Sequence, residues 1–319
     1  MKQFKNRREF IRSTSTGIIG ISMASGALSS IYEAHGAQEK VKVAVCRNER
    51  AISSRNVCDK KQVVLMVENA FFTITGKKNP KEIWTYLGVT KDDVVGIKVN
   101  CNSSGFPLYA HPELVYALCD SLISVVPPNN IIIYERYTSE LTRAGFPSNK
   151  SNSGIRCFGV EEGGGFHPKE GLTRIITDTC TKLINVPTLK AFGGDFVGSL
   201  FLKNHVGSLP LGNMSRCHGN TEYLCNICSQ PSIKNKTVLA LCDGLRGNYK
   251  RGSPWYWYGI IMSRDQIAAE YTALQVINEK LTEEKERTNK IPSYVSLAET
   301  AYNLGTCNPM NIDINKTVL

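Results

Sequence analysis

Short apolar runs alternate with amphipathic stretches along most of this 319-residue chain. Residues 41–45, 94–99 and 131–134 are apolar runs of strand length. Between the last two, residues 111–123 place apolar side chains at helical spacing, and Pro112 suits a first helical turn. Because strand, helix and strand follow in this order, we expect a parallel βαβ unit.

The rest of the chain continues this alternation. The further predicted elements are helices at 62–72, 138–145, 266–283 and 293–302 and strands at 182–186 and 237–242. Asp265 directly precedes the longest of these helices, and we expect it to cap that helix. The pattern predicts an α/β fold, with a mostly parallel sheet flanked by helices.

Residues 147–171 interrupt the alternation. Ser, Asn and Gly dominate this stretch, and residues 163–165 are three consecutive glycines. This composition is typical of turns, so we predict a loop-rich insertion. No helix start follows the glycines, which favours a turn over a phosphate-binding loop.

Polar residues follow several of the predicted strands. Asn100 and Cys101 follow one strand, residues 185–190 close a second, and Asp243 follows a third. Ligands of parallel α/β sheets bind outside the carboxyl ends of the strands. We therefore expect these polar groups to lie at the ligand-binding edge.

The N-terminus carries an arginine pair, Arg7-Arg8, followed by Phe10 and a Gly- and Ser-rich apolar run at 17–28. This order, with the small-residue exit Ala34-His35-Gly36, resembles a twin-arginine export signal. The resemblance implies a signal at residues 1–36, the twin-arginine translocase as a partner, and a periplasmic or otherwise exported protein. Residues 37–319 would then form a single α/β domain. A basic amphipathic helix of the fold, or an uncleaved anchor, are the alternatives.

Composition narrows the classes of partner. The formal net charge is +10, but the chain has no run of five like charges and no basic stripe interleaved with aromatic residues. Nucleic acid is therefore not expected as a partner. The basic balance fits an anionic ligand, or equally a solvated surface. Apart from the N-terminal run, no stretch has the length and apolarity of a membrane span, so none is expected after signal cleavage.

Three of the eleven cysteines are concentrated with one histidine in a short segment, Cys217-His218-x6-Cys225-x2-Cys228. Thiolates and imidazole are ligands of soft or borderline metals, so Cys217, Cys225, Cys228 and His218 predict an iron–sulfur cluster or a transition metal, iron or zinc. Buried core thiols and a redox disulfide are the alternatives. Since eleven is odd, the cysteines cannot all pair within one chain.

A second group of residues could hold an anion. Lys190, Lys203, His205 and His218 are expected to converge, and two lysines with two histidines suit phosphate or carboxylate. Asp243 could orient His205 or His218, or cap the turn at Asp243-Gly244. The catalytic candidates are Lys203, His205 and Asp243, and the cofactor-binding candidates are Lys190, Asn204 and His218. A solvated basic loop is the alternative.

Several segments resemble the domain-of-unknown-function 362 family across residues 90–305. The segments are residues 95–100, 111–115, 183–190, 197–207, 217–219, 242–247 and 263–268, and Lys203-Asn204-His205 is the most specific part. Members of that family are often exported by the twin-arginine route, and some carry or accompany iron–sulfur modules. This chain lacks the closely spaced cysteines of a ferredoxin module.

Two functional hypotheses follow. The first is an exported metal- or iron–sulfur-binding protein with a role in periplasmic redox chemistry or electron transfer, which implies a redox partner protein. The alternative is a metal-independent enzyme or binding protein for a small anionic ligand, with a Lys/His/Asp pocket. The sequence does not decide whether the protein is an enzyme.

Overall fold

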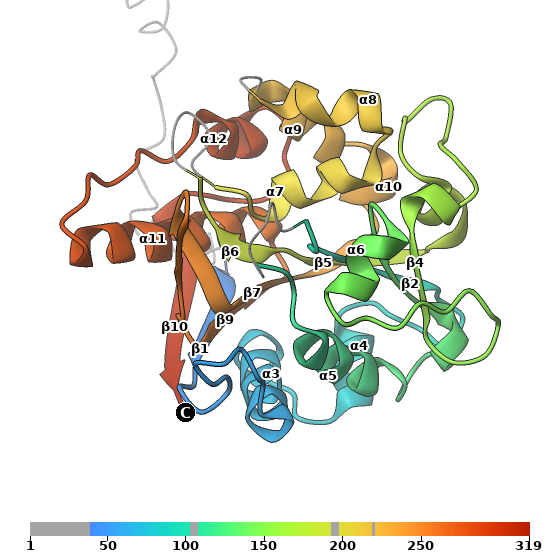
Figure 1. Ribbon diagram of the computed structural model, residues 1–319, viewed down its shortest axis with the longest axis horizontal. Helices are drawn as coiled ribbons and strands as arrows, with labels where there is room; N and C mark the ends of the chain where they lie inside the picture. Colours follow the sequence, from blue (N-terminus) through green and yellow to red (C-terminus); the bar gives the residue numbers. More distant parts are fainter. Residues whose placement is uncertain (1–38, 103–107, 193–197, 219–220) are drawn as a thin grey trace, which may run out of the picture. The chain divides into compact units, whose positions relative to one another are not determined.

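The computed structural model describes residues 39–102, 108–192, 198–218 and 221–319 (Figure 1). Residues 40–319 form one compact unit around a sheet with ten described strands. The strands are β1 Val41–Arg47, β2 Val95–Val99, β3 Ile131–Glu135, β4 Arg156–Gly159, β5 Lys182–Val186, β6 Thr188–Lys190, β7 Thr237–Lys250, β8 Ser253–Trp255, β9 Gly259–Ser263 and β10 Ile312–Val318.

The helices vary widely in length. They are α3 Lys60–Thr75, α4 Pro80–Tyr86, α5 Pro112–Leu122, α6 Thr138–Arg143, α7 Phe201–Asn204, α8 Leu211–Met214, α9 Thr221–Cys228, α10 Pro231–Lys234, α11 Gln266–Glu283 and α12 Ser293–Thr300. Short 3-10 and π turns, η1 to η6, lie at Pro128–Asn130, Val160–Glu162, Ile175–Thr179, His205–Ser208, Ser215–Cys217 and Pro309–Asn311. Among the described helices, none has the length and apolar character to cross a membrane.

The sheet is mostly parallel. Its order is β10-β1-β9-β7-β5-β2-β3-β4, with β6 and β8 paired to β7. The five strands from β7 to β4 run parallel, whereas β9 is antiparallel to both β7 and β1. The predicted unit of strand, helix and strand is confirmed as β2, α5 and β3.

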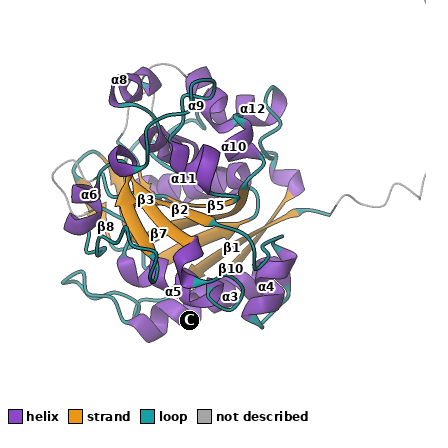
Figure 2. Cartoon of the chain, turned by 90° about the vertical axis from the view of Figure 1, so that its right-hand side faces the viewer, coloured by secondary structure: helices purple, strands orange, loops and turns teal. Residues whose placement is uncertain are grey.

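Each strand divides its side chains between two hydrophobic cores. In β3, Ile132 and Tyr134 enter the core beneath α11 and α12, while Ile131 and Ile133 enter the core beneath α3 and α5. This alternation follows from the two-residue repeat of a strand, and it requires helices on both faces. Figures 1 and 2 show these helices on opposite faces of the sheet, which confirms the predicted α/β architecture.

Two sequence expectations change in the structure. The stretch 147–171 does contain turns, with Gly164 and Gly165 at positive φ, but it also supplies β4, which pairs with β3 and belongs to the sheet. Strand β7 does not end near residue 242; it continues to Lys250, because β9 pairs with its residues 240–244 and β6 and β8 pair with residues from 243 to 250. Asp243 therefore lies within a strand.

The strand order defines a preferred place for a ligand. From β2 the chain proceeds outward through β3 to β4, and from β5 it proceeds in the other direction to β7. The order therefore reverses between β2 and β5. Ligands of open α/β sheets bind at such a switch point, outside the carboxyl ends of the strands.

Candidate functional site

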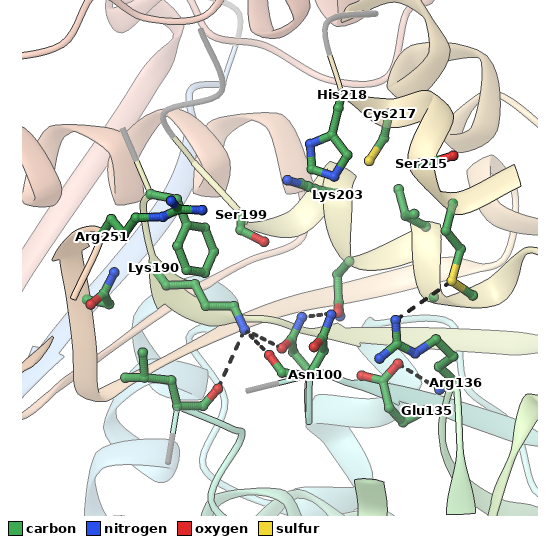
Figure 3. Close-up of a pocket in the computed structure, with 18 of the residues that line it drawn as sticks. Asn100, Glu135, Arg136, Lys190, Ser199, Lys203, Ser215, Cys217, His218 and Arg251 are labelled. Carbon is green, nitrogen blue, oxygen red and sulfur yellow. Dashed lines mark hydrogen bonds between the residues drawn. The ribbon is translucent and has the colours of Figure 1, made fainter. Parts of the chain in front are cut away.

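A pocket of ≈ 930 Å³ lies at this switch point (Figure 3). This volume suits a small-molecule ligand. Its described lining comes from the segments that follow β2 and β3, from β6, α7 and the turn after η5, and from the hairpin of β7 and β8. The lining includes Asn100, Asn102, Glu135, Arg136, Lys190, Lys203, Asn204, Gly207, Cys217, His218, Asn248 and Arg251.

A buried ion pair forms part of the pocket floor. The Lys98 ammonium lies 2.8 Å from Glu135 Oε1, and both side chains are almost fully buried. Glu135 also accepts the Cys101 N–H at 2.9 Å and the Arg136 N–H at 2.7 Å. A buried charge is tolerated when it is paired and hydrogen-bonded, so this carboxylate is neutralised before any ligand arrives.

Side-chain amides connect Lys190 to the interior. The Lys190 ammonium donates to Asn100 Oδ1 at 2.6 Å, and Asn100 Nδ2 donates to Asn204 Oδ1 at 3.1 Å. Asn204 Nδ2 donates to Asn185 Oδ1 at 2.8 Å, and Asn185 Nδ2 donates to Gln266 Oε1 at 3.3 Å. Each amide accepts from one neighbour and donates to the next, so these hydrogen bonds connect β6, the residue after β2, α7, β5 and α11.

Lys190 has little freedom within this arrangement. Besides Asn100, its ammonium donates to the carbonyls of Asn102 at 3.0 Å and Leu108 at 3.5 Å, which accounts for its three protons. Burial lowers the pKa of Lys190 to about 8, although the Glu135 charge opposes the shift. Lys190 therefore supplies positive charge to the pocket while its three donors are all used within the protein.

The other cationic groups face the pocket from separate segments. Figure 3 shows the Lys203 ammonium beside the His218 ring and Cys217, with Arg251 on the other side of the pocket. Burial lowers the pKa of Lys203, and burial together with the nearby Lys203 charge lowers the pKa of His218. Burial raises the pKa of the Cys217 thiol, which Lys203 partly offsets. Such cations gain from an anion, which would relieve their mutual repulsion.

Arg136 contributes charge at the lower edge of the pocket. Its guanidinium pairs with Glu140, one turn away on α6, and approaches the Met214 sulfur at 3.9 Å. Glu140 thus offsets part of the Arg136 charge. On the other side of the pocket, Lys203 lies beside the imidazole of His218.

The structure brings together Lys190, Lys203, Asn204 and His218 as predicted candidates, but His205 is not among the pocket's described lining residues. His205 is fully buried, and neither ring nitrogen has a hydrogen-bond partner among the described residues. Burial, with the nearby Lys98 charge, lowers its pKa to about 3, so the ring is neutral. We assign His205 to the packing behind the pocket.

Of the two roles that the sequence left open for Asp243, the structure does not show the pairing with His205 or His218. Asp243 Oδ2 instead accepts the backbone N–H of His111 at 2.7 Å and contacts His111 Nδ1 at 2.8 Å. Although burial opposes the shift, the Asp243 carboxylate raises the pKa of His111. Asp243 Oδ1 accepts the Leu245 N–H, so the carboxylate holds the start of α5 against β7.

The four predicted metal ligands do not form a site in the described residues, where no three His, Cys, Asp or Glu side chains are gathered to hold a metal ion. Cys225 Sγ contacts the Tyr294 carbonyl at 3.3 Å, and Cys228 Sγ contacts the Leu202 carbonyl at 3.5 Å. Both thiols are fully buried and belong to the core beneath α11, and burial raises the pKa of each. In the described residues both thiols therefore lie as core residues, which is one of the alternatives that the sequence left open.

Sequence reasoning missed Lys98, Glu135, Asn248 and Arg251. A signal existed for the first two, because each is a charged residue in or at the end of an otherwise apolar strand. No comparable signal marked Asn248 or Arg251. Their place in the pocket depends on the unforeseen continuation of β7 into the hairpin with β8.

Fold and site together define an α/β protein with a cationic pocket at the switch point of its sheet. Comparisons with protein-family models, with curated proteins and with solved structures found no match. The resemblance to the domain-of-unknown-function 362 family therefore stays a prediction from sequence.

Proposed function

We propose that this protein binds a small anionic molecule in the switch-point pocket. One observation carries the proposal: cationic side chains from four separate segments, Lys190, Lys203, Arg136 and Arg251, line one pocket. The described lining contains one carboxylate, Glu135, and Lys98 neutralises it. Positive charge that converges from independent segments on a concave site suits phosphate or carboxylate.

Titration with inorganic phosphate and simple carboxylates, followed by calorimetry and thermal unfolding, tests the proposal. We expect binding that weakens as salt rises, and about a 10-fold loss of affinity in Lys203→Gln or Arg251→Gln. The matched controls are Lys91→Gln and Arg287→Gln, because both residues are exposed and lie outside the described pocket lining. Equal losses in pocket and control variants, or no anion binding at all, would refute the proposal.

Export is a further proposal, and it rests on the N-terminal sequence. Residues 1–36, apart from the described structure, carry the Arg7-Arg8 pair, and we propose that they address the chain to the twin-arginine translocase. Fusion of residues 1–36 to a reporter that folds before export measures this directly. The double variant Arg7→Lys/Arg8→Lys should abolish export, and export that persists would contradict the proposal.

A metal- or iron–sulfur-dependent redox role, with a redox partner protein, remains the other proposal. It rests on the clustering of Cys217, His218, Cys225 and Cys228 in the sequence. Elemental analysis and a visible spectrum of protein purified without oxygen test it. Stoichiometric iron with a charge-transfer band would favour the redox role, whereas metal-free protein that binds anions would favour the first proposal.

A further inference from the structure

The cationic side chains of the pocket reach it from separate parts of the sheet. Arg136 directly follows β3, whereas Arg251 lies in the turn between β7 and β8. Because β5 and β2 separate β7 from β3, the axes of these two strands are about 14 Å apart, at a strand spacing of about 4.8 Å. Figure 3 shows Arg136 at the lower right of the pocket, while Lys203, His218 and Arg251 face its upper part. The pocket therefore offers positive charge in two separate places.

Glu140 occupies one edge of the Arg136 guanidinium. Arg136 Nε and Nη2 donate to the two carboxylate oxygens of Glu140, which lies on α6. A guanidinium carries five N–H groups, and Nη1 and Nη2 form a second edge that holds a carboxylate or phosphate through two parallel hydrogen bonds. Among the described residues, Nη1 meets the Met214 sulfur at 3.9 Å, and a thioether is a weak acceptor. The second edge of Arg136 is therefore suited to an anionic group of the ligand.

The upper part of the pocket suits another anionic group. Arg251 and His218 are exposed and Lys203 is partly exposed, so a ligand in the pocket can reach all three. Glu135 is the one carboxylate among the described lining residues, and Figure 3 shows it beside Arg136, away from this upper part. An anion bound in the upper part therefore meets positive charge without an opposing carboxylate in the described lining.

The wall between the two places is already hydrogen-bonded within the protein. Asn100 follows β2, which lies between β7 and β3 in the sheet. Its Oδ1 accepts from Lys190 and its Nδ2 donates to Asn204, and all three protons of Lys190 are used. The strongest donors for a ligand therefore lie at the two ends of the pocket, and an uncharged segment of the ligand suits the middle.

Resting on the anion-binding function proposed above, we infer that the ligand carries two anionic groups joined by an uncharged chain. One group binds the second edge of Arg136, and the other binds Lys203, His218 and Arg251. The pocket volume of ≈ 930 Å³ is near the upper end of the range of about 300–1,000 Å³ for small-molecule sites, so it exceeds the needs of an isolated ion. Arg136 is thus a specificity-determining residue that distinguishes a dianion from a monoanion.

A series of linear dicarboxylates tests the inference on the wild-type protein, by calorimetry at neutral pH and constant ionic strength. The dicarboxylates are malonate, succinate, adipate and suberate, and butyrate, hexanoate and octanoate match the last three in chain length. We expect adipate or suberate to bind about 10-fold more tightly than its monocarboxylate, because the second carboxylate gains two charged hydrogen bonds to Arg136. Malonate controls for charge, since its two carboxylates are too close together to reach both places. It should bind about 10-fold more weakly than the preferred longer dicarboxylate.

The variant Arg136→Gln assigns the preference to this residue. The preferred dicarboxylate should then bind within about 2-fold of its monocarboxylate. Arg143→Gln is the matched control, because Arg143 is exposed on α6 and lies outside the described pocket lining, and it should keep the wild-type preference. A preference that survives Arg136→Gln, or that both variants lose equally, would overturn the inference.

The wild-type series decides even if Arg136→Gln does not fold. Equal binding of dicarboxylates and their monocarboxylates, or malonate binding as tightly as the longer dicarboxylates, would overturn the inference and leave the anion-binding function intact. Binding of inorganic phosphate without binding of any carboxylate would have the same meaning. Failure of every probe, inorganic phosphate included, would overturn both proposals.

Discussion

Gly207 lies where a side chain would collide with the buried ion pair. A Cβ atom added at this position would be 2.7 Å from Glu135 Oε1 and 2.9 Å from the Lys98 ammonium. Both distances are shorter than van der Waals contact, and neither charged group has room to move, because both are almost fully buried. The glycine lets the segment after α7 approach the charges that form the pocket floor.

We predict that Gly207→Ala lowers the free energy of unfolding by about 2–3 kcal/mol, the usual cost of forcing an atom into a packed interior. Gly212→Ala is the control, because Gly212 lies in α8 with open space around its Cα. Alanine there should leave stability unchanged or raise it slightly. Urea unfolding measures both variants, and similar values for the two would contradict the predicted collision.

Glu270 of α11 contacts α7 and makes the stability of the fold depend on pH. Its carboxylate accepts the Leu202 N–H at 3.1 Å and the Tyr294 hydroxyl at 2.7 Å. Burial raises the pKa of Glu270 from 4.5 to about 7, so the folded state prefers the protonated form. The preference of the folded state for protonated Glu270 stabilises the fold fully below pH 4.5. This stabilisation is lost as the pH rises through 7, because the buried carboxyl then has to ionise.

Between pH 5 and pH 8, the wild-type free energy of unfolding should therefore fall relative to that of Glu270→Gln, by up to about 3 kcal/mol. Denaturant titrations at each pH measure the difference. Glu68→Gln serves as the control, since Glu68 is exposed on α3 and should show no such trend. A pH-independent difference between the wild type and Glu270→Gln would exclude the raised pKa.

At the scale of elements, two aspartates cap the N-termini of the two longest described helices, α3 and α11, and differ in what else they bind. Asp59 accepts the N–H groups of Lys61 and Gln62 at the exposed start of α3. Asp265 caps α11 in the same way, as the sequence predicted, and also accepts the Thr306 N–H at 2.9 Å. Asp265 thus joins the start of α11 to the segment after α12.

We predict a loss of about 1 kcal/mol of unfolding free energy for Asp59→Ala and about 2 kcal/mol for Asp265→Ala. The larger loss follows from the Thr306 N–H, which keeps no partner once the carboxylate is removed. Thermal unfolding of the two variants side by side measures the difference. Equal losses would show that the bond to Thr306 adds nothing to the cap.

Elements with a clear local pattern were predictable, and those that depend on distant partners were not. The helix α5 begins at Pro112 and β2 is a continuous apolar run, so both could be located from sequence. The second half of β7 contains Asp243, Gly244, Arg246 and Gly247, which locally favour a turn. Pairing with β6, β8 and β9 overrides that preference.

The same limit applies to the candidate site. Lys190, Lys203 and His218 could be found because they are polar residues next to apolar segments. The partner of Asp243 could not be found, because His111 and Asp243 are 132 residues apart and meet only across the folded sheet. For the cysteines, residue type alone allowed either metal ligands or core residues, and the core positions of Cys225 and Cys228 could not be located from the sequence.

At the scale of the whole molecule, residues 40–319 form a compact unit with a hydrophobic core on each face of one sheet. We therefore predict that the fragment 37–319 folds cooperatively and unfolds within about 2 °C of the full-length chain. Differential scanning calorimetry measures both proteins. A midpoint lowered by more than about 5 °C, a loss above 1 kcal/mol for a chain of this size, would show that residues 1–36 stabilise the fold.

The distribution of sulfur has a practical consequence. All eleven cysteines are free thiols, and nine of them are buried, while Cys58 and Cys307 are partly exposed. Alkylating reagents attack an accessible thiolate, so the nine buried thiols react only when the chain opens around them. Their positions span residues 46 to 242 and both cores. Mass spectrometry after brief alkylation would therefore record the order in which parts of the molecule open, with no label introduced.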